Sequence, residues 1–185
     1  MSVLKIVEWP SKILLTPAEK VTAFDSELKK LVTDMQETMS STGGIGLAAN
    51  QVGILKQVTV IHVVFSKEPE NFKKEWWYDK PLVFINPVIT KKVGKTVYQE
   101  GCLSFPNIYE NINRSAELWV TAQDVNGKEF ETHATGDLAV CLQHEIDHLN
   151  GIVFIDRMSR LKYAIVKRKL LRSYNAPEDA SEMEA

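Results

Sequence analysis

The run His144-Glu145-Ile146-Asp147-His148 carries the strongest structural signal in this sequence. Residues four apart lie one turn apart on the same face of an α-helix, so His144 and His148 can bind a single metal ion while Glu145 points toward a bound water. This is the arrangement of metal-assisted hydrolysis. A catalytic site normally takes three protein ligands and keeps one position for water, so the third ligand decides the class of enzyme.

Two familiar kinds of third ligand fit this sequence poorly. A third histidine in the longer pattern H-E-x-x-H-x-x-G-x-x-H would fall at position 154, which is Phe154. The glutamates that follow the motif lie in a polar tail: Glu178, Glu182 and Glu184. An upstream thiolate or carboxylate remains, and Cys102 lies in the unusual stretch Glu100-Gly101-Cys102-Leu103-Ser104.

Three motifs occur in order along the chain: Gly44-Ile45-Gly46-Leu47-Ala48-Ala49-Asn50-Gln51, Glu100-Gly101-Cys102-Leu103-Ser104 and Gln143-His144-Glu145-Ile146-Asp147-His148. Together they resemble the peptide deformylases, metal hydrolases that remove the formyl group from the N-terminus of newly made bacterial proteins. The likeness extends from about residue 3 to about residue 170, and every motif position matches. The resemblance implies a hydrolase that acts on N-formylmethionyl peptides and releases formate.

The resemblance also implies a ligand set and a metal. Cys102, His144 and His148 would bind the ion, and Fe²⁺ would be the native one. Zn²⁺, Ni²⁺ or Co²⁺ could take its place, because all of these ions accept imidazole and thiolate ligands. The sequence does not choose among them.

Further roles follow from the same resemblance. Glu145 would accept and return a proton, while the side-chain amide of Gln51 and the backbone N–H of Leu103 would stabilise the oxyanion. The residues implied to bind the substrate are Gly44, Ile45, Gly46, Glu100, Gly101, Val140 and Cys141. They would form a glycine-rich backbone surface for an extended peptide and a hydrophobic pocket for an unbranched side chain such as methionine.

The second cysteine, Cys141, needs a separate interpretation. With Cys102, His144 and His148 it could form a closed Cys₂His₂ structural site. Position 141 lies about 10 Å along the helix axis from position 148, however, which is a long span for side chains that share one ion. We therefore expect Cys141 to be a small buried hydrophobic residue in the wall of the substrate pocket.

Composition and charge indicate one soluble globular domain. The chain has 185 residues, 44% of them hydrophobic, and its 22 basic and 24 acidic side chains give a net charge of −2. Such a balance provides no global field for nucleic acid or an anionic membrane. No signal peptide or apolar stretch of about 18 residues is present, so we expect a cytoplasmic protein. Transient contact with the ribosome through a basic C-terminal helix is a further expectation.

The hydrophobic pattern predicts an α+β fold, with antiparallel β-sheets packed around the central HExxH helix, an N-terminal helix and a C-terminal helix. One catalytic domain would span 1–174, followed by an acidic, disordered tail over 175–185. The expected helices begin at Asp25 or Ser26, near Thr135 and near 159; the second ends at Asn150-Gly151. The expected strands are 57–65, 82–85, 96–99, 108–114, 116–123 and 128–133, with a hairpin across Asn126-Gly127 and a strand end at Asn86-Pro87.

Asp147 and the segment 66–81 each give a local expectation. Asp147, between the histidines, should pair with a cation such as Arg114, because an unpaired buried carboxylate is costly. The aromatic-rich segment 66–81 should either pack on its own domain or border the peptide cleft. A zinc endopeptidase and a binding protein with a purely structural metal remain the alternative functions.

Overall fold

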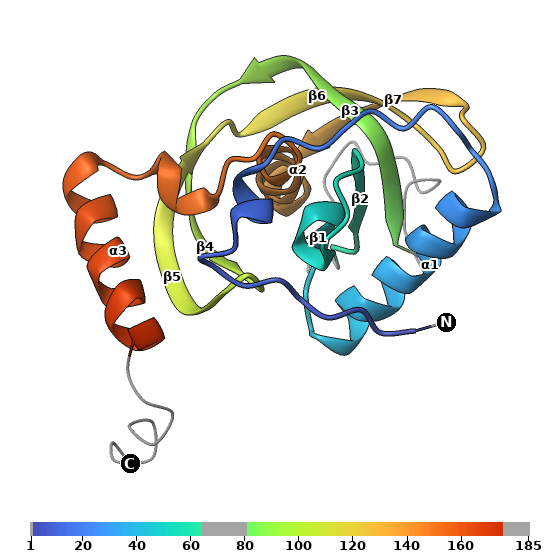
Figure 1. The fold of residues 1–185 in the computed structure, drawn as a ribbon. Coiled ribbons are helices and arrows are strands. Elements are labelled where there is room, and N and C mark those ends of the chain that lie inside the picture. Colours follow the sequence, from blue (N-terminus) through green and yellow to red (C-terminus); the bar gives the residue numbers. More distant parts are fainter. Residues whose placement is uncertain (1, 64–80, 176–185) are drawn as a thin grey trace.

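Two antiparallel sheets enclose one helix in the computed structural model, which describes residues 2–63 and 81–175 (Figure 1). The α-helices of these residues are α1 (Ser26–Ser41), α2 (Gly136–Leu149) and α3 (Arg160–Asn175). The strands are β1 (Gly46–Ala48), β2 (Val58–Ile61), β3 (Leu82–Val93), β4 (Thr96–Cys102), β5 (Phe105–Arg114), β6 (Glu117–Gln123) and β7 (Glu129–Thr135). Short 3₁₀ turns occur at Lys12–Leu15, Ala49–Val52 and Phe154–Arg157.

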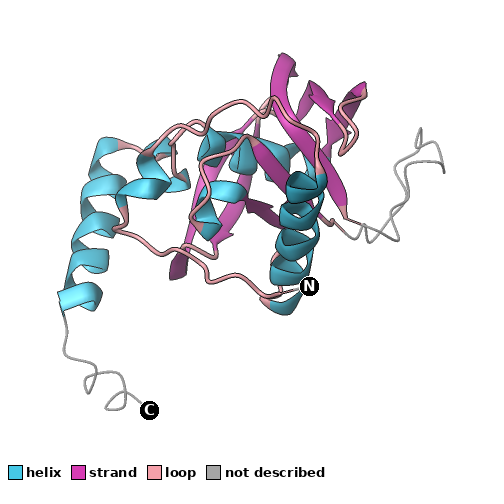
Figure 2. Cartoon of the chain, turned by 45° about the vertical axis from the view of Figure 1, so that its right-hand side comes forward, coloured by secondary structure: helices cyan, strands magenta, loops and turns pink. Residues whose placement is uncertain are grey.

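The sheets form two walls on either side of α2. One sheet has the strand order β1-β2-β3-β6-β7, and the other is the hairpin β4-β5. Figure 1 shows α2 end-on between these walls, with α1 beside the first sheet and α3 outside β5. In the turned view of Figure 2, α1 and α3 stand on opposite sides of the strands. The predicted α+β arrangement is confirmed.

Helix α2 is the buried centre of the molecule. Every residue from Leu138 to Leu149 is buried, and Leu138, Leu142 and Ile146 belong to the core that includes Phe84 and Val120 of the large sheet. A helix that is apolar around most of its circumference needs contacts on all sides, and the two sheets provide them. Side chains of this helix are therefore fixed by packing before any ligand binds.

Both ends of α2 follow the local sequence. The helix begins directly after β7, where Gly136 has φ 55°, and it ends before Gly151, which has φ 71° and donates to the carbonyl of His148 at 2.9 Å. Glycine adopts such positive φ values without the strain that a Cβ causes. The predicted start near Thr135 and end at Asn150-Gly151 are confirmed.

Other elements confirm the sequence prediction with altered bounds. Asp25 caps α1, because its Oδ1 accepts from the Leu28 N–H at 3.0 Å, and the hairpin β6-β7 forms across 124–128. The strands β4 and β5 extend toward each other beyond their predicted ends, so that Cys102 pairs with Phe105 across a tight turn. The third expected helix, α3, includes Asn175, which the sequence had placed in the tail. The remaining tail and nearly all of segment 66–81 lie outside the described residues.

The prediction that a strand ends at Asn86-Pro87 is wrong. β3 continues through both residues to Val93, and its register with β6 shifts between Ile85 and Val88. Asn86 has φ 51°, and its side chain bonds both the N–H and the C=O of Val21, at 2.8 and 2.9 Å. A β-bulge accommodates the residue without a ladder N–H, so the proline interrupts pairing without ending the strand.

The turn after α2 gives a stability prediction. A Cβ at Gly151 would lie 2.7 Å from the Leu15 carbonyl oxygen, whereas a Cβ at Gly43, which has a similar φ of 69°, would meet nothing within 4 Å. Gly43→Ala should therefore cost only the conformational strain of about 1–2 kcal/mol. Gly151→Ala should cost clearly more, about 2–4 kcal/mol, because backbone must also move.

Urea unfolding of the two variants measures this difference directly. Equal losses of unfolding free energy in Gly43→Ala and Gly151→Ala would show that the contact with Leu15 carries no cost.

Candidate metal centre and active site

Three side chains from two elements place potential metal-ligand atoms close together. Cys102 comes from the end of β4, and His144 and His148 come from α2; their ligand atoms all lie within 4.8 Å of one another. The Cys102 Sγ to His148 Nε2 distance is 3.2 Å, and the two Nε2 atoms are also 3.2 Å apart. A tetrahedral ion with Zn–N and Zn–S bond lengths would hold such atoms about 3.3–3.6 Å apart. The geometry and the donor atoms fit a divalent transition metal.

The surroundings fix the ring of His144 by a hydrogen bond and enclose His148 by burial. His148 has 0% relative exposure, and its backbone carbonyl accepts a hydrogen bond from the Asn50 side chain of the first motif. His144 Nδ1 lies 2.8 Å from Glu100 Oε2. When Nδ1 donates to this carboxylate, Nε2 is left with its lone pair toward the ion, as is usual for metal-binding histidines.

Glu100 is itself held by a buried guanidinium. Arg114 donates to it twice, from Nε to Oε1 at 2.6 Å and from Nη2 to Oε2 at 2.9 Å. Burial alone would raise the pKa of Glu100, but the hydrogen bonds from Arg114 and His144 outweigh it and lower the pKa to about 2. Glu100 lines the cavity as expected for a substrate-binding residue, yet its carboxylate is engaged in orienting His144. The sequence analysis missed this role.

The predicted pairing of Asp147 is confirmed. Arg114 Nη1 donates to Asp147 Oδ2 at 2.5 Å, so one arginine bridges the carboxylates of Glu100 and Asp147. Arg157, which the sequence analysis did not select, adds a second cation through Nε at 3.0 Å and Nη2 at 2.5 Å. Its position ten residues after Asp147, beyond the helix end, gave no local signal for this contact.

Glu145 is buried beside the ligands without being one of them. It is 3% exposed, and among the described residues its Oε2 has no hydrogen-bond partner. Burial, and to a lesser extent the charge of Glu100, raises the pKa of Glu145 to about 7, although His144 and Arg114 oppose the rise. A carboxylate with this proton affinity can both accept and return a proton near neutral pH. A bound cation nearby would favour the ionised form.

A cavity of about 620 Å³ opens in front of these groups. The predicted catalytic and substrate-binding residues that line it are Gly44, Ile45, Gly46, Gln51, Glu100, Gly101, Cys102, Leu103, Val140, Cys141, His144 and Glu145. His148 lies behind this surface. The structure therefore brings all three sequence motifs to one place.

The side chain of Gln51 is aimed at the metal centre. Its Nε2 lies 3.4 Å from Cys102 Sγ and 3.3 Å from Ser104 Oγ, and its Oε1 accepts from the Ala48 N–H at 2.9 Å. The bond from Ala48 fixes which end of the amide faces the cavity. The sequence analysis gave Ser104 no role of its own and did not predict its contact with Gln51.

The glycines of the motifs allow close packing inside the site. A Cβ at Gly46 would overlap the Glu145 carboxylate and would lie 2.7 Å from Cys141 Sγ. A Cβ at Gly44 would lie 2.9 Å from Leu103. The sequence predicted that these glycines let an extended peptide approach the backbone, which stays a prediction. The close neighbours in the structure are Glu145, Cys141 and Leu103 of the chain itself.

Cys141 lies outside the group of ligands. Its thiol is buried, it contacts the Ile45 carbonyl at an S to O distance of 3.7 Å, and burial raises its pKa well above the ordinary value. A buried thiol without an adjacent cation behaves as a small hydrophobic group. The closed Cys₂His₂ arrangement finds no support in this geometry.

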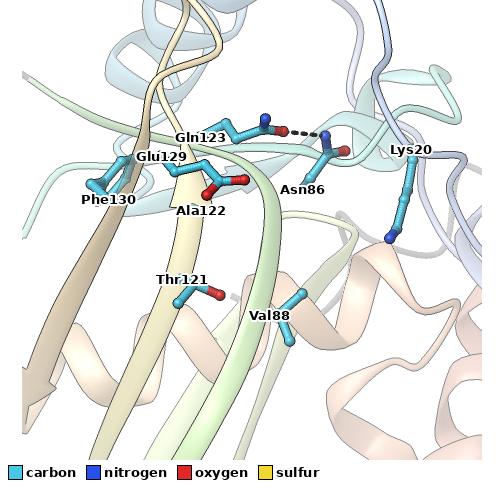
Figure 3. Close-up of a pocket in the computed structure, with 8 residues that line it drawn as sticks. All are labelled: Lys20, Asn86, Val88, Thr121, Ala122, Gln123, Glu129 and Phe130. Carbon is cyan, nitrogen blue, oxygen red and sulfur yellow. Dashed lines mark hydrogen bonds between the residues drawn. The ribbon is translucent and has the colours of Figure 1, made fainter.

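A second cavity, of about 560 Å³, lies over β3, β6 and β7 (Figure 3). Figure 3 shows the Asn86 and Gln123 side chains bonded to each other at its edge, at 2.7 Å. Among the described residues that line it, only Lys20 and Glu129 are titratable, and none is a histidine or a cysteine. This cavity offers no hydrolytic chemistry.

Comparison with known proteins assigns the chain to a family. The family model described as Polypeptide deformylase matches residues 3–164. The chain belongs to the polypeptide deformylase family. A peptide deformylase of Chromobacterium violaceum is 45% identical over 170 residues, which cover 92% of this chain and 95% of that protein. One from Neisseria meningitidis serogroup B is 43% identical, with the same coverage.

Solved structures agree with this assignment. The peptide deformylase of Ehrlichia chaffeensis in complex with actinonin has a TM-score of 0.83 and 41% identity, covering 96% of this chain and 100% of that one. The Legionella pneumophila enzyme has a TM-score of 0.81 and 37% identity, covering 95% and 100%. The predicted family, fold class and metal-dependent hydrolase class are confirmed. No described helix is both long and apolar enough to cross a membrane.

The arginine bridge gives the second stability prediction. Arg114→Met would leave two buried carboxylates, Glu100 and Asp147, without this cation, and should cost about 3–5 kcal/mol of unfolding free energy. Asp147→Asn should cost less, because Arg114 keeps both bonds to Glu100 and Arg157 is partly exposed.

Urea unfolding provides the measurement, with Lys162→Met as the control. The side chains of Lys162 and its partner Glu110 are 52% and 29% exposed, so the loss of this surface pair should cost at most about 1 kcal/mol. Arg114→Met and Lys162→Met with similar stabilities would contradict the structural role of the bridge.

Proposed function

We propose that this chain hydrolyses the formyl amide of N-formylmethionyl peptides and releases formate and a free N-terminal methionine. One observation carries the proposal: Cys102, His144 and His148 converge beside Glu145, whose Oε2 has no hydrogen-bond partner among the described residues, in a cavity lined by all three family motifs. The family of the chain supports the same reaction.

Cys102, His144 and His148 would hold the metal ion. When bound, the ion supplies a water of lowered pKa and polarises the formyl oxygen. Fe²⁺ is the proposed native ion, with Zn²⁺, Ni²⁺ or Co²⁺ as substitutes, because one thiolate and two imidazoles suit all four. Glu100 and Arg114 keep His144 in the orientation that this role needs.

Glu145 carries the proton through the reaction. Its unpartnered Oε2 accepts a proton from the attacking water, and the same oxygen returns it to the amine as the C–N bond breaks. Burial keeps this carboxylate away from bulk water, so the proton passes between the reacting groups.

The oxyanion is stabilised by two donors. The Gln51 amide, held by Ala48, and the backbone N–H of Leu103 donate to the oxygen on which negative charge develops. Because Ala48 fixes the Gln51 amide before the reaction, little energy is spent on its reorganisation.

Substrate binding uses the remaining lining residues. The backbone of 44–46 and 100–101 faces the cavity and would run along the extended peptide. Ile45, Val140 and Cys141 provide an apolar wall for the unbranched methionine side chain. The experiment that tests the whole proposal is formate release from formyl-Met-Ala-Ser by anaerobically purified protein, with an unformylated internal peptide as the endopeptidase control.

The proposed setting is the cytoplasm, close to protein synthesis. Six basic residues and no acidic one occur in α3, which stands at the side of the molecule (Figure 2). A helix of this charge could support a transient contact with the ribosome, without sequence-specific recognition of nucleic acid. Formylated nascent chains would then meet the enzyme where they emerge.

Replacing Glu145 by Gln tests the proton carrier. Glu145→Gln should keep the metal and lower kcat by about 10²–10⁴-fold, because an amide cannot accept the proton. Formate release and the bound metal content are measured on the same sample. Near-normal kcat at full metal occupancy would overturn the assigned role.

The identity of the ion predicts a difference in oxygen sensitivity. The Fe²⁺ form should lose activity in air much faster than the Zn²⁺ form, because oxygen can oxidise Fe²⁺ and, with it, the cysteine that ligates it, whereas zinc has no redox chemistry. Activity is followed together with the oxidation state of Cys102 by mass spectrometry. Equal losses in both forms, with Cys102 unoxidised, would contradict an iron-based mechanism of inactivation.

A further inference from the structure

The lining of the active-site cavity includes two polar residues that the proposed chemistry does not use. Tyr98 of β4 and Asp137 in the first turn of α2 both line the cavity. Tyr98 precedes Glu100 by two positions, so the two side chains share one face of the strand, and Asp137 lies two turns before His144 on one face of the helix. Glu100 contacts His144, which shows that these faces meet.

Tyr98 and Asp137 lie further along the same two elements. Burial is the main cause that raises the pKa of Tyr98, and the side chain and negative charge of Asp137 add to it. Burial is also the main cause that raises the pKa of Cys141, one turn further along α2 than Asp137. The negative charges of Glu145, Glu100 and Asp137 raise it further. The electrostatic influence of Asp137 therefore extends along the wall of the pocket.

The spacing along the two elements places this pair about 7–10 Å from the metal-binding part of the cavity. α2 rises about 10 Å from Asp137 to His144, and β4 advances about 7 Å from Tyr98 to Glu100. Val140 and Cys141 supply the apolar wall between the two ends. An unbranched side chain that starts at the reacting amide would pass over this wall and direct its tip toward Asp137.

We propose that Asp137, oriented by Tyr98, is a specificity determinant that admits N-formyl peptides whose first side chain is unbranched and ends in a cation, as in lysine, and that excludes side chains ending in a carboxylate. This inference rests on the proposed deformylase function. The aliphatic stem of lysine packs as methionine does, and its ammonium group extends further toward the acid. Opposite charges attract and like charges repel more strongly in a half-buried slot than in water.

A simpler role for Asp137 explains less. An acidic side chain in the first turn of a helix is favourable wherever it points, because the N-terminal N–H groups are unpaired. That effect does not require a position in the lining of the cavity. Asp137 and Tyr98 line the cavity together, which points to a role in the pocket.

Three matched substrates test the inference on the unmodified enzyme. The value of kcat/KM is measured for formyl-Lys-Ala-Ser, formyl-norleucyl-Ala-Ser and formyl-Glu-Ala-Ser, with the metal-loaded protein. We expect the lysine peptide to exceed the glutamate peptide by about tenfold or more, and the neutral norleucine peptide to be hydrolysed as methionine is. Equal values for the lysine and glutamate peptides would overturn the inference.

Variants assign the preference to the proposed residues. Asp137→Asn should reduce the lysine-to-glutamate ratio about fivefold or more, whereas Glu131→Gln, which removes the same charge from an exposed position on β7, should leave the ratio unchanged. Tyr98→Phe should reduce the ratio less, through KM for the lysine peptide. A ratio that is the same in Asp137→Asn and Glu131→Gln would contradict the role of Asp137, and an unchanged ratio in Tyr98→Phe would contradict its orienting role.

The outcomes separate this inference from the function on which it rests. If formyl-Met-Ala-Ser is not hydrolysed with any of the four metals, the proposed function fails and the inference falls with it. If that peptide is hydrolysed but Asp137 does not affect the ratio, only the inference fails.

Discussion

The buried guanidinium of Arg114 is the contact on which the arrangement of the active site depends. It comes from the end of β5 and bonds Glu100 on β4 and Asp147 on α2, so it ties the small sheet to the central helix. Burying three charges is costly, and such a group stabilises only when every member is hydrogen-bonded. Here all three groups are hydrogen-bonded, and the bridge also positions the ligands. It fixes Glu100 against His144, and Cys102, two residues later, lies beside His148.

The metal centre therefore lies where separate layers of the fold meet. Cys102 and His148 are 46 residues apart and belong to different elements, and Gln51 comes from a third part of the chain, next to β1. Bonds that do not involve an ion hold the Gln51 side chain, through the Ala48 N–H, and the backbone of His148, through the Asn50 side chain. The ligand and donor groups are thus positioned by folding, which lowers the reorganisation needed for binding and catalysis.

Sequence predicted the parts of this structure that depend on local signals. The bounds of α2, the cap at Asp25 and the Asn126-Gly127 hairpin follow from glycine, capping and turn preferences, and the family motifs indicated the residues around the cavity. The course of β3 could not be predicted, because Asn86 is held by Val21, 65 residues away. Similarly, the bond of Glu100 to His144 spans 44 residues, and its motif position suggested only substrate binding.

The burial of α2 couples catalysis to specificity. Along this one helix, Asp137, Cys141 and His144 face the same cavity, with His148 behind it, while the opposite side packs on the large sheet through Leu138 and Leu142. A rigid helix fixes the distance between the reacting centre and the far end of the side-chain pocket. A side chain whose length does not match this distance would move its amide away from Glu145 and the ion. Selection at the far end of the pocket then acts on the rate as well as on binding, because misplacement of the reacting bond raises the barrier.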